Sequence, residues 1–239
     1  MTIRNDLIKH QIFLQRLGAT QARIIMDQIR LSYQSVADGV KRRIPVEITK
    51  ATLKMQTKTL VEKAMQHLKD AALYEAEFIA KRLKARGYTD SLMMPAQEVI
   101  ETAVTKTTMG VKSGAKGKSL NVAHSQFANR KHSEMLQLVT DDVLQQKPEE
   151  KTLEALGLLV AGLFVTQARS LGTTAVTFTA ATAREEVFKE AEVPRVVWSA
   201  ILDSSVCPDC EALDGDEWNV GENPIPPEHW NCRCVLVPV

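Results

Sequence analysis

The residues most capable of binding a metal or of other chemistry are four cysteines and a histidine near the end of the 239-residue sequence. Cys207 and Cys210 form a C-x2-C pair, and His229, Cys232 and Cys234 follow in the segment H-x2-C-x-C. A C-x2-C pair places two thiolates on one tight turn, where both can bind one tetrahedral ion. In an extended second segment, Cys232 and Cys234 lie on the same face because side chains alternate along a strand. The pattern predicts a metal site with five candidate ligands.

Zinc is the metal that this donor set favours. Zn²⁺ takes four thiolate or imidazole ligands in tetrahedral geometry, and a site closed by four protein ligands has no open position for catalysis. The spacing leaves open whether all four cysteines bind with His229 beside them, or three bind together with His229. Disulfide bonding is the alternative, and it is typical of oxidising compartments. The first residues, Met1 to Asp6, show no secretory signal, so we expect synthesis in a reducing cytoplasm.

Acidic residues near these ligands raise the question of catalysis. Asp214, Asp216 and Glu217 could form an acid–base set with His229. The segment L-D-G-D-E is more typical of a turn, because an Asp-Gly pair adopts turn geometry readily. The sequence contains no legible Ser/His/Asp or Cys/His triad, and a zinc ion saturated with thiolates is a poor Lewis acid. We therefore expect no enzymatic activity.

The amino-acid sequence around the ligands is more informative about the type of protein than the ligand spacing is. The segments occur in a fixed order: W-S-A-I-L-D (198–203), C-P-D-C (207–210), L-D-G (213–215) and P-P-E-H-W-N-C-R-C (226–234). This order resembles the C-terminal domain of the phage Mu F-like minor head proteins, also called phage head morphogenesis proteins. The resemblance covers about residues 173–239, and the preceding A-R-E-E (183–186) fits the segment that leads into that domain.

The resemblance implies a structural virion protein bound at the portal vertex. Such a protein would act in head assembly, with a further role in DNA packaging or ejection. It implies several copies in an assembly in the head or the head–tail neck, made in the host cytoplasm. The implied partners are the portal protein and other head or neck proteins, with non-specific contact to packaged DNA.

The chain upstream of the cysteines is typical of a helical protein. Hydrophobic residues make up 44% of the sequence, which supports a packed core, and the net charge of +1 excludes a strongly basic or acidic protein overall. Ala, Leu, Gln, Glu, Lys and Thr dominate, and most of these favour helices. The longest apolar run, residues 155–165, is too short to cross a bilayer, so we expect no membrane contact.

Apolar periodicity predicts a mainly α fold. A stripe with steps of three or four residues predicts a helix over 5–44, ending before Pro45, and a second helix to about Arg86 would complete a long antiparallel hairpin. Pro95 would open a short third helix. Further helices are expected over 119–146 and from Pro148, with Gly172 separating the latter from a last helix that ends near residue 194.

The last residues should form a small α+β, Cys/His-rich zinc knot with strands over 195–202 and 233–237. The predicted order is a helical hairpin region (1–110), a basic linker (111–118), a second helical region forming a bundle (119–194) and the metal-binding subdomain (195–239). About forty residues are too few for a core of their own. Zinc would supply the missing stability, with Trp198, Trp218 and Trp230 packed around the knot.

A stretch without acids offers an alternative function. No Asp or Glu occurs between Glu101 and Glu134, whereas cations recur. A phosphate-binding loop is excluded because the G-x4-G-K-S pattern would need a glycine where Lys112 stands. The alternative is a zinc-containing DNA-binding protein that uses the basic 106–131 segment, although a solvated linker fits equally well. The candidate contacts to DNA phosphates are Lys112, Lys116, Lys118, Arg130 and Lys131.

Overall fold

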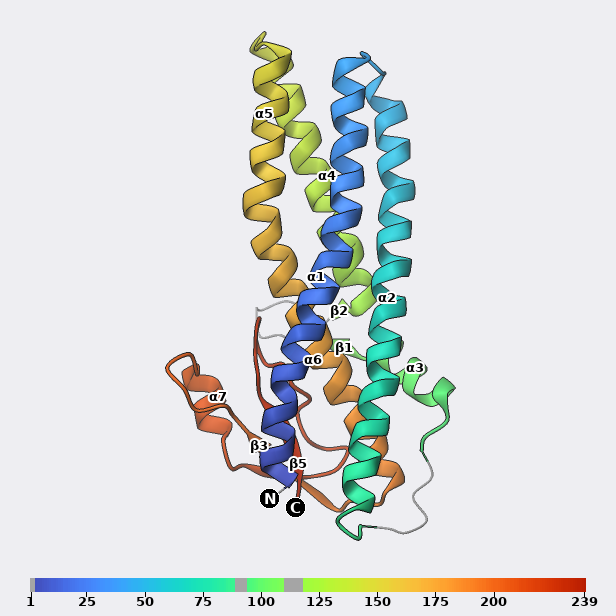
Figure 1. Cartoon of the computed structure of the whole chain (residues 1–239), viewed down its shortest axis with the longest axis vertical. Coiled ribbons are helices and arrows are strands. Elements are labelled where there is room, and N and C mark those ends of the chain that lie inside the picture. The colour runs from blue at the N-terminus through green and yellow to red at the C-terminus, as the bar shows by residue number, and fades with distance from the viewer. Residues whose placement is uncertain (1–2, 89–93, 110–117) are drawn as a thin grey trace.

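Two long antiparallel helices form the axis of the molecule, as Figure 1 shows for a computed structural model that describes residues 3–88, 94–109 and 118–239. They are α1 (Ile3–Lys41) and α2 (Val46–Lys84). The chain reverses where Arg43 takes a positive φ of 52° and the Ile44 amide donates to the Gly39 carbonyl. Pro45 is the N-cap residue of α2, where the chain leaves the turn and enters the helix. The predicted helical hairpin is confirmed.

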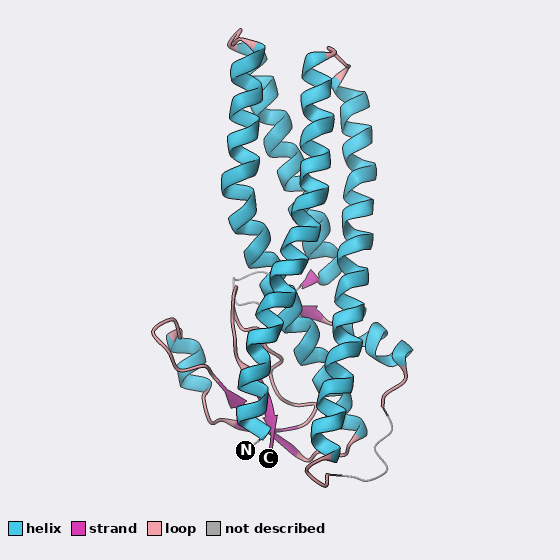
Figure 2. Ribbon diagram, in the orientation of Figure 1, coloured by secondary structure: helices cyan, strands magenta, loops and turns pink. Residues whose placement is uncertain are grey.

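The remaining helices complete a bundle around this hairpin (Figure 2). A short helix, α3 (Gln97–Lys106), precedes a two-stranded ribbon of β1 (Thr108–Met109) and β2 (Lys118–Ser119). The ribbon leads into α4 (Leu120–Leu144). After Pro148, one continuous helix consists of α5 (Glu149–Leu159), a π-helical turn η1 (Val160–Phe164) and α6 (Val165–Glu190). Because α6 packs against both α1 and α2, the two predicted helical regions do not have separate cores, and both contribute to each of the two clusters of buried side chains.

The prediction that Gly172 separates two helices is wrong. Gly172 lies inside α6, where a Cβ would come within 2.6 Å of the Gly18 carbonyl oxygen of α1. A Cβ on Gly18 would in turn lie 2.8 Å from the Thr173 Cα. The two glycines therefore allow the backbones of α1 and α6 to touch, and this contact outweighs the low helix propensity of glycine.

The helix from Glu149 to Glu190 is also long and apolar enough to cross a membrane by length and composition. Core helices of soluble bundles share that property. Leu171, Phe178 and Phe188 are buried and make α6 the central helix of the bundle, whereas only 33% of the most apolar stretch of this long helix is buried, and Leu158 and Leu163 are exposed.

A three-stranded antiparallel sheet closes the base of the bundle. Its order is β4 (Glu217–Asn219), β3 (Arg195–Ser199) and β5 (Val235–Pro238), with Val196 opposite Trp218 and Trp198 opposite Leu236. The predicted strands and the mainly α fold with a small C-terminal sheet are thus confirmed.

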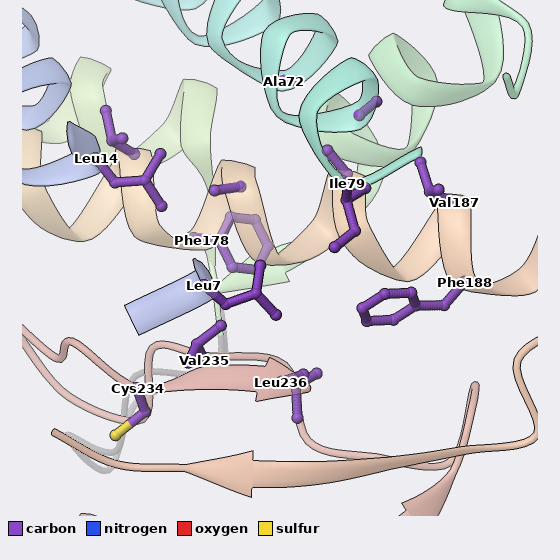
Figure 3. Packing of buried hydrophobic residues seen from close by; sticks show 14 of the residues in the cluster. Leu7, Leu14, Ala72, Ile79, Phe178, Val187, Phe188, Cys234, Val235 and Leu236 are labelled. Carbon is purple, nitrogen blue, oxygen red and sulfur yellow. The ribbon is translucent and has the colours of Figure 1, made fainter. Parts of the chain in front are cut away.

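The sheet is not an isolated knot, because the helices cover it. Val235 and Leu236 of β5 are buried in one cluster with Leu7, Phe178 and Phe188, and Figure 3 shows Val235 pointing toward Leu7 of α1. The C-terminal segment therefore gains hydrophobic stabilisation from the bundle as well as from any metal.

A buried polar group fixes α2 against α6 near this sheet. The Arg184 guanidinium donates to Glu75 Oε1, and His10 Nε2 lies 2.7 Å from Glu75 Oε2. Burial alone would raise the pKa of Glu75, but Arg184 and His10 outweigh it and hold that pKa below its usual range. The carboxylate therefore stays charged within the core and ties α1, α2 and α6 together.

Candidate metal centre

The first pair of cysteines lies at the start of a short helix. Cys207 is the N-cap of α7 (Pro208–Leu213), and Pro208 occupies the first helical position, where its fixed φ is favourable. The backbone amide of Cys210 donates to Cys207 Sγ at 3.3 Å. The local C-P-D-C sequence thus turns both sulfur atoms to one side.

The second ligand segment is a tight turn anchored to the bundle. The Cys232 amide donates to the His229 carbonyl at 3.1 Å, and Asn231 between them takes a φ of 63°. The Asn231 amide also donates to Thr174 Oγ1 of α6 at 3.0 Å. Cys234 then leads directly into β5, so the turn is held by a helix at one point and by the sheet at its end.

All five predicted ligands come together. His229 Nε2 lies 3.0 Å from the sulfur atoms of both Cys207 and Cys210, and the sulfurs of Cys210 and Cys232 are 3.7 Å apart. Two overlapping groups each have their ligand atoms within 4.8 Å of one another: Cys207, Cys210 and His229, and Cys210, Cys232 and Cys234. All four cysteines are free thiols, so the disulfide alternative finds no support in this geometry.

The distances fit a metal of the size of zinc. With Zn–S bonds of about 2.3 Å and tetrahedral angles, two sulfurs on one ion lie about 3.8 Å apart, close to the separation of Cys210 and Cys232. The contacts of His229 are shorter than the ~3.5 Å expected between sulfur and nitrogen on a shared zinc. His229 would therefore move outward by a fraction of an ångström to become a ligand.

His229 has the orientation of a metal ligand. Its Nδ1 lies 2.9 Å from the Trp230 carbonyl oxygen, which can only accept a hydrogen bond. Nδ1 therefore carries a proton, and Nε2 on the other side of the ring faces Cys207 and Cys210. Metal-binding histidines commonly have the second ring nitrogen fixed in this way.

The buried thiols favour a bound cation. Burial raises the pKa of Cys210, whereas a hydrogen bond with Cys234 lowers the pKa of Cys232 to about 5. The hydrogen bond with Cys232 raises the pKa of Cys234, and burial and the charge on Cys232 add to the shift. Without a metal, the thiolate form is thus favoured at Cys232 and disfavoured at Cys210 and Cys234, and a divalent cation bound between these sulfurs would favour the thiolate form.

The Asp203–Arg233 ion pair, which the sequence did not identify, braces the cluster. The Arg233 guanidinium forms two bonds with Asp203, at 2.7 and 2.6 Å. The bonds from Arg233 hold the pKa of Asp203 at about 2. This pair joins the C-R-C turn to the loop that follows β3, and it places a positive charge beside Cys232 and Cys234. In the sequence, this pair was indicated only by Arg233, the single Lys or Arg that follows Arg195 in an acidic segment.

Glu185 of α6 provides a second anchor. Its carboxylate accepts from the Gly221 amide at 2.7 Å and from Asn223 Nδ2 at 3.2 Å. Burial raises the pKa of Glu185. The A-R-E-E segment thus has two tasks, since Arg184 faces the helices and Glu185 faces the C-terminal loops.

The acids considered for catalysis have structural contacts. Asp214 accepts from the Ala200 amide at 2.8 Å and lies 3.6 Å from Arg4. Glu217 forms an ion pair with Arg195 at 2.9 Å. Gly215 takes a φ of +92°, which agrees with the expected Asp-Gly turn. In this arrangement, Asp214 and Glu217 fix the sheet to its surroundings.

The tryptophans divide into two kinds. Trp198 is buried and meets Trp218 edge-on, with ring centroids 6.5 Å apart. Trp230 remains 45% exposed and lines a groove beside α4 and α6. The expectation that all three pack around the knot is therefore wrong for Trp230.

The predicted DNA contacts are not equivalent. Lys112 and Lys116 lie outside the described residues. Lys118 and Arg130 are exposed. Lys131 is buried, with its ammonium 2.7 Å from Glu134 and 4.5 Å from the centroid of the Phe164 ring. The prediction is wrong for Lys131, because its stem packs inside the bundle and its charge is already paired.

Residues 145–237 match the model of the family described as Phage Mu protein F like protein. The match spans α5, α6, the sheet and the complete Cys/His cluster, and it begins upstream of the resemblance seen in the sequence. It covers less than half of the chain, and α1 to α4 lie outside it. No curated protein and no solved structure matches the chain.

Proposed function

We propose that this protein is a structural component of a phage head, present in several copies at the portal vertex, and that it acts in head assembly. The family match over 145–237 carries this proposal, because the matched segment coincides with a physical unit. That unit contains the central helix α6, the sheet packed on it and the two loops that meet at the Cys/His cluster.

The Cys/His cluster binds one structural zinc ion in this proposal. Cys207, Cys210 and Cys232 would supply three ligands, with His229 or Cys234 as the fourth. The ion would join the α7 loop to the turn before β5. Metal bonds would thus hold together two segments that have few large apolar side chains. Its binding free energy would then contribute directly to folding of the C-terminal region. Four protein ligands leave no site for substrate, so the role is structural and not catalytic.

The long bundle serves as the body that presents this region to the portal protein and to other head or neck proteins. A rigid body suits assembly, because little conformational entropy is lost when it binds a partner. Contact with packaged DNA during packaging or ejection is a further part of the proposal. Of the predicted DNA contacts that the structure describes, Lys118 and Arg130 are exposed.

The test uses the phage that encodes this chain. Purified virions should contain the protein at a fixed ratio to the portal protein, measured by quantitative mass spectrometry. Purified protein should also cosediment with portal rings, and the Cys210→Ser variant should do so less well. A matched Ser204→Ala variant, at an exposed position in the loop before α7, should behave as wild type. Absence from washed virions, together with no binding to portal rings, would contradict the proposal.

A further inference from the structure

A groove lies between α4, α6 and the metal-ligand turn. Its volume is about 370 Å³, within the range of sites that hold small ligands or peptide side chains. Phe127 of α4 and Leu171 of α6 contribute apolar surface, and Trp230 forms a wall. The hydrogen bond from the Asn231 amide to Thr174 holds this wall against α6. Trp230 is exposed although its neighbours in the turn are fixed.

The groove has a positive character. Lys118 and Arg130 line it, and none of the described residues around it is an acid. Lys118 bonds to Gln126 Oε1 at 2.6 Å, which uses one of the three donors of its ammonium. Within residues 3–88, 94–109 and 118–239, no acid pairs with the Lys118 ammonium or with the exposed guanidinium of Arg130, so both can bind an anionic group.

The groove also contains an acceptor that needs a donor. Gln167 Oε1 of α6 is buried at the lining and has no hydrogen-bond partner within the part of the chain that the structure describes. Buried amide oxygens are normally paired. A ligand that brings an N–H or O–H group as well as negative charge would satisfy both this acceptor and the two cations.

We propose that this groove binds a short acidic segment of a partner protein. A carboxylate would lie between Lys118 and Arg130, an apolar side chain would pack between Trp230 and Phe127, and a backbone N–H would donate to Gln167 Oε1. An extended peptide offers all three groups within a few residues. The proposal is independent of the virion role, since any partner with this chemistry would fit.

Single-stranded DNA matches the chemical groups of the groove less well than an acidic peptide does. Its phosphates would meet the two cations and a base could stack on Trp230, but its backbone carries no strong donor for Gln167 where the phosphates bind. These features favour the peptide.

The experiment probes the full-length protein with an array of randomised octapeptides and, at the same salt concentration, with single-stranded dT20. We expect capture of peptides that combine Asp or Glu with Leu, Phe or Met. Binding of the best peptide, measured by fluorescence anisotropy, should weaken about tenfold in Arg130→Gln and in Trp230→Ala. The matched control is Arg23→Gln, which removes one exposed arginine of α1 away from the groove.

Gln167→Leu separates binding from folding. This variant should raise the thermal midpoint, because it removes an unpaired buried acceptor, yet weaken the peptide about threefold to tenfold. Metal content and circular dichroism confirm that each variant is folded. If Trp230→Ala fails to fold, Arg130→Gln and Gln167→Leu on the helices still decide the matter.

Three results would overturn the proposal. They are an array with no enrichment of acidic peptides, peptide binding that is equal in wild type and Arg130→Gln, and dT20 binding that depends on Arg130 while peptides do not bind. The last result would assign the groove to nucleic acid instead.

Discussion

The two ends of this molecule are stabilised in different ways. The distal half of the bundle, away from the sheet, has a core of aliphatic and aromatic side chains such as Ile25, Leu60 and Met135. Burial lowers the pKa of His124 and His132 in this half to about 4, while Leu144 at the tip is 76% exposed. The basal half combines its core with a buried ion pair, a sheet and the Cys/His cluster. Packing between helices holds the first half, whereas the second half adds a sheet, a buried ion pair and the Cys/His cluster to its helix packing.

This difference predicts that loss of the cluster will unfold the base selectively. Cys210→Ser removes the sulfur shared by both ligand groups, so zinc binding should fall below one ion per chain. We expect the free energy of unfolding of residues 195–239 to drop by at least ~3 kcal/mol, with the distal helices intact. Hydrogen exchange read by mass spectrometry measures both regions at once. Equal loss of protection at Leu60 and at Leu236 would contradict the division.

The buried ion pair should have the next largest effect. Glu75→Gln leaves Arg184 without its carboxylate in the core, at a cost of about 3–5 kcal/mol. The matched control is Glu77→Gln two residues along α2, where the exposed pair with Lys81 contributes only about 0.3–0.5 kcal/mol. Urea unfolding measures the two changes. Similar midpoints for both variants would show that the buried pair does not hold the base.

Acid should weaken the distal half through its histidines. Burial lowers the pKa of His132 to about 4 from 6.5. Because the unfolded chain binds the proton more readily, stability is complete above pH 6.5 and is lost as the pH falls from 6.5 toward 4. The loss is about 3 kcal/mol at most.

His132→Gln should flatten this dependence, although it costs some stability at pH 7 because the ring bonds to Ser32 and Thr57. His67→Gln is the comparison, since burial lowers the pKa of His67 as well but that ring is only partly buried. Unfolding curves between pH 7.5 and 4.5 measure the slopes. An unchanged slope in His132→Gln would assign the acid sensitivity elsewhere.

The contact between the halves should tolerate no added methyl group. Gly172→Ala forces α6 away from Gly18 and should cost about 1–3 kcal/mol. Gly162→Ala, in the same continuous helix but with open space around the new Cβ, should be neutral or stabilise by up to about 1 kcal/mol. Thermal unfolding of the pair tests the close approach. Stabilisation by Gly172→Ala would mean that α1 and α6 are not in contact there.

The fold was predictable where its cause is local. Apolar periodicity and the prolines at 45 and 148 indicated α1, α2, α4 and the start of α5. Gly172 was misread because a glycine in a helix either ends it or lets another backbone approach, and only the distant Gly18 decides between the two. The burial of β5 under α1 could not be foreseen for the same reason.

Prediction of the candidate site was also limited to features that are local in the sequence. The five ligands were recognisable because their spacing along the chain is itself the geometric requirement. The residues that position them were not, since Thr174 and Glu185 act from a helix and Asp203 reaches Arg233 from another loop. Lys131 looked like a surface cation because its sequence context cannot reveal Phe164 and Glu134 around it.

The metal content of the purified, reduced protein tests the central claim most directly. Atomic absorption, with hydrogen exchange before and after chelation, would give the zinc stoichiometry and the region that depends on it. We predict one zinc per chain, with loss of protection over residues 195–239 on chelation and unchanged protection in the distal helices. A metal-free protein with four titratable thiols and a protected sheet would contradict a zinc-stabilised base.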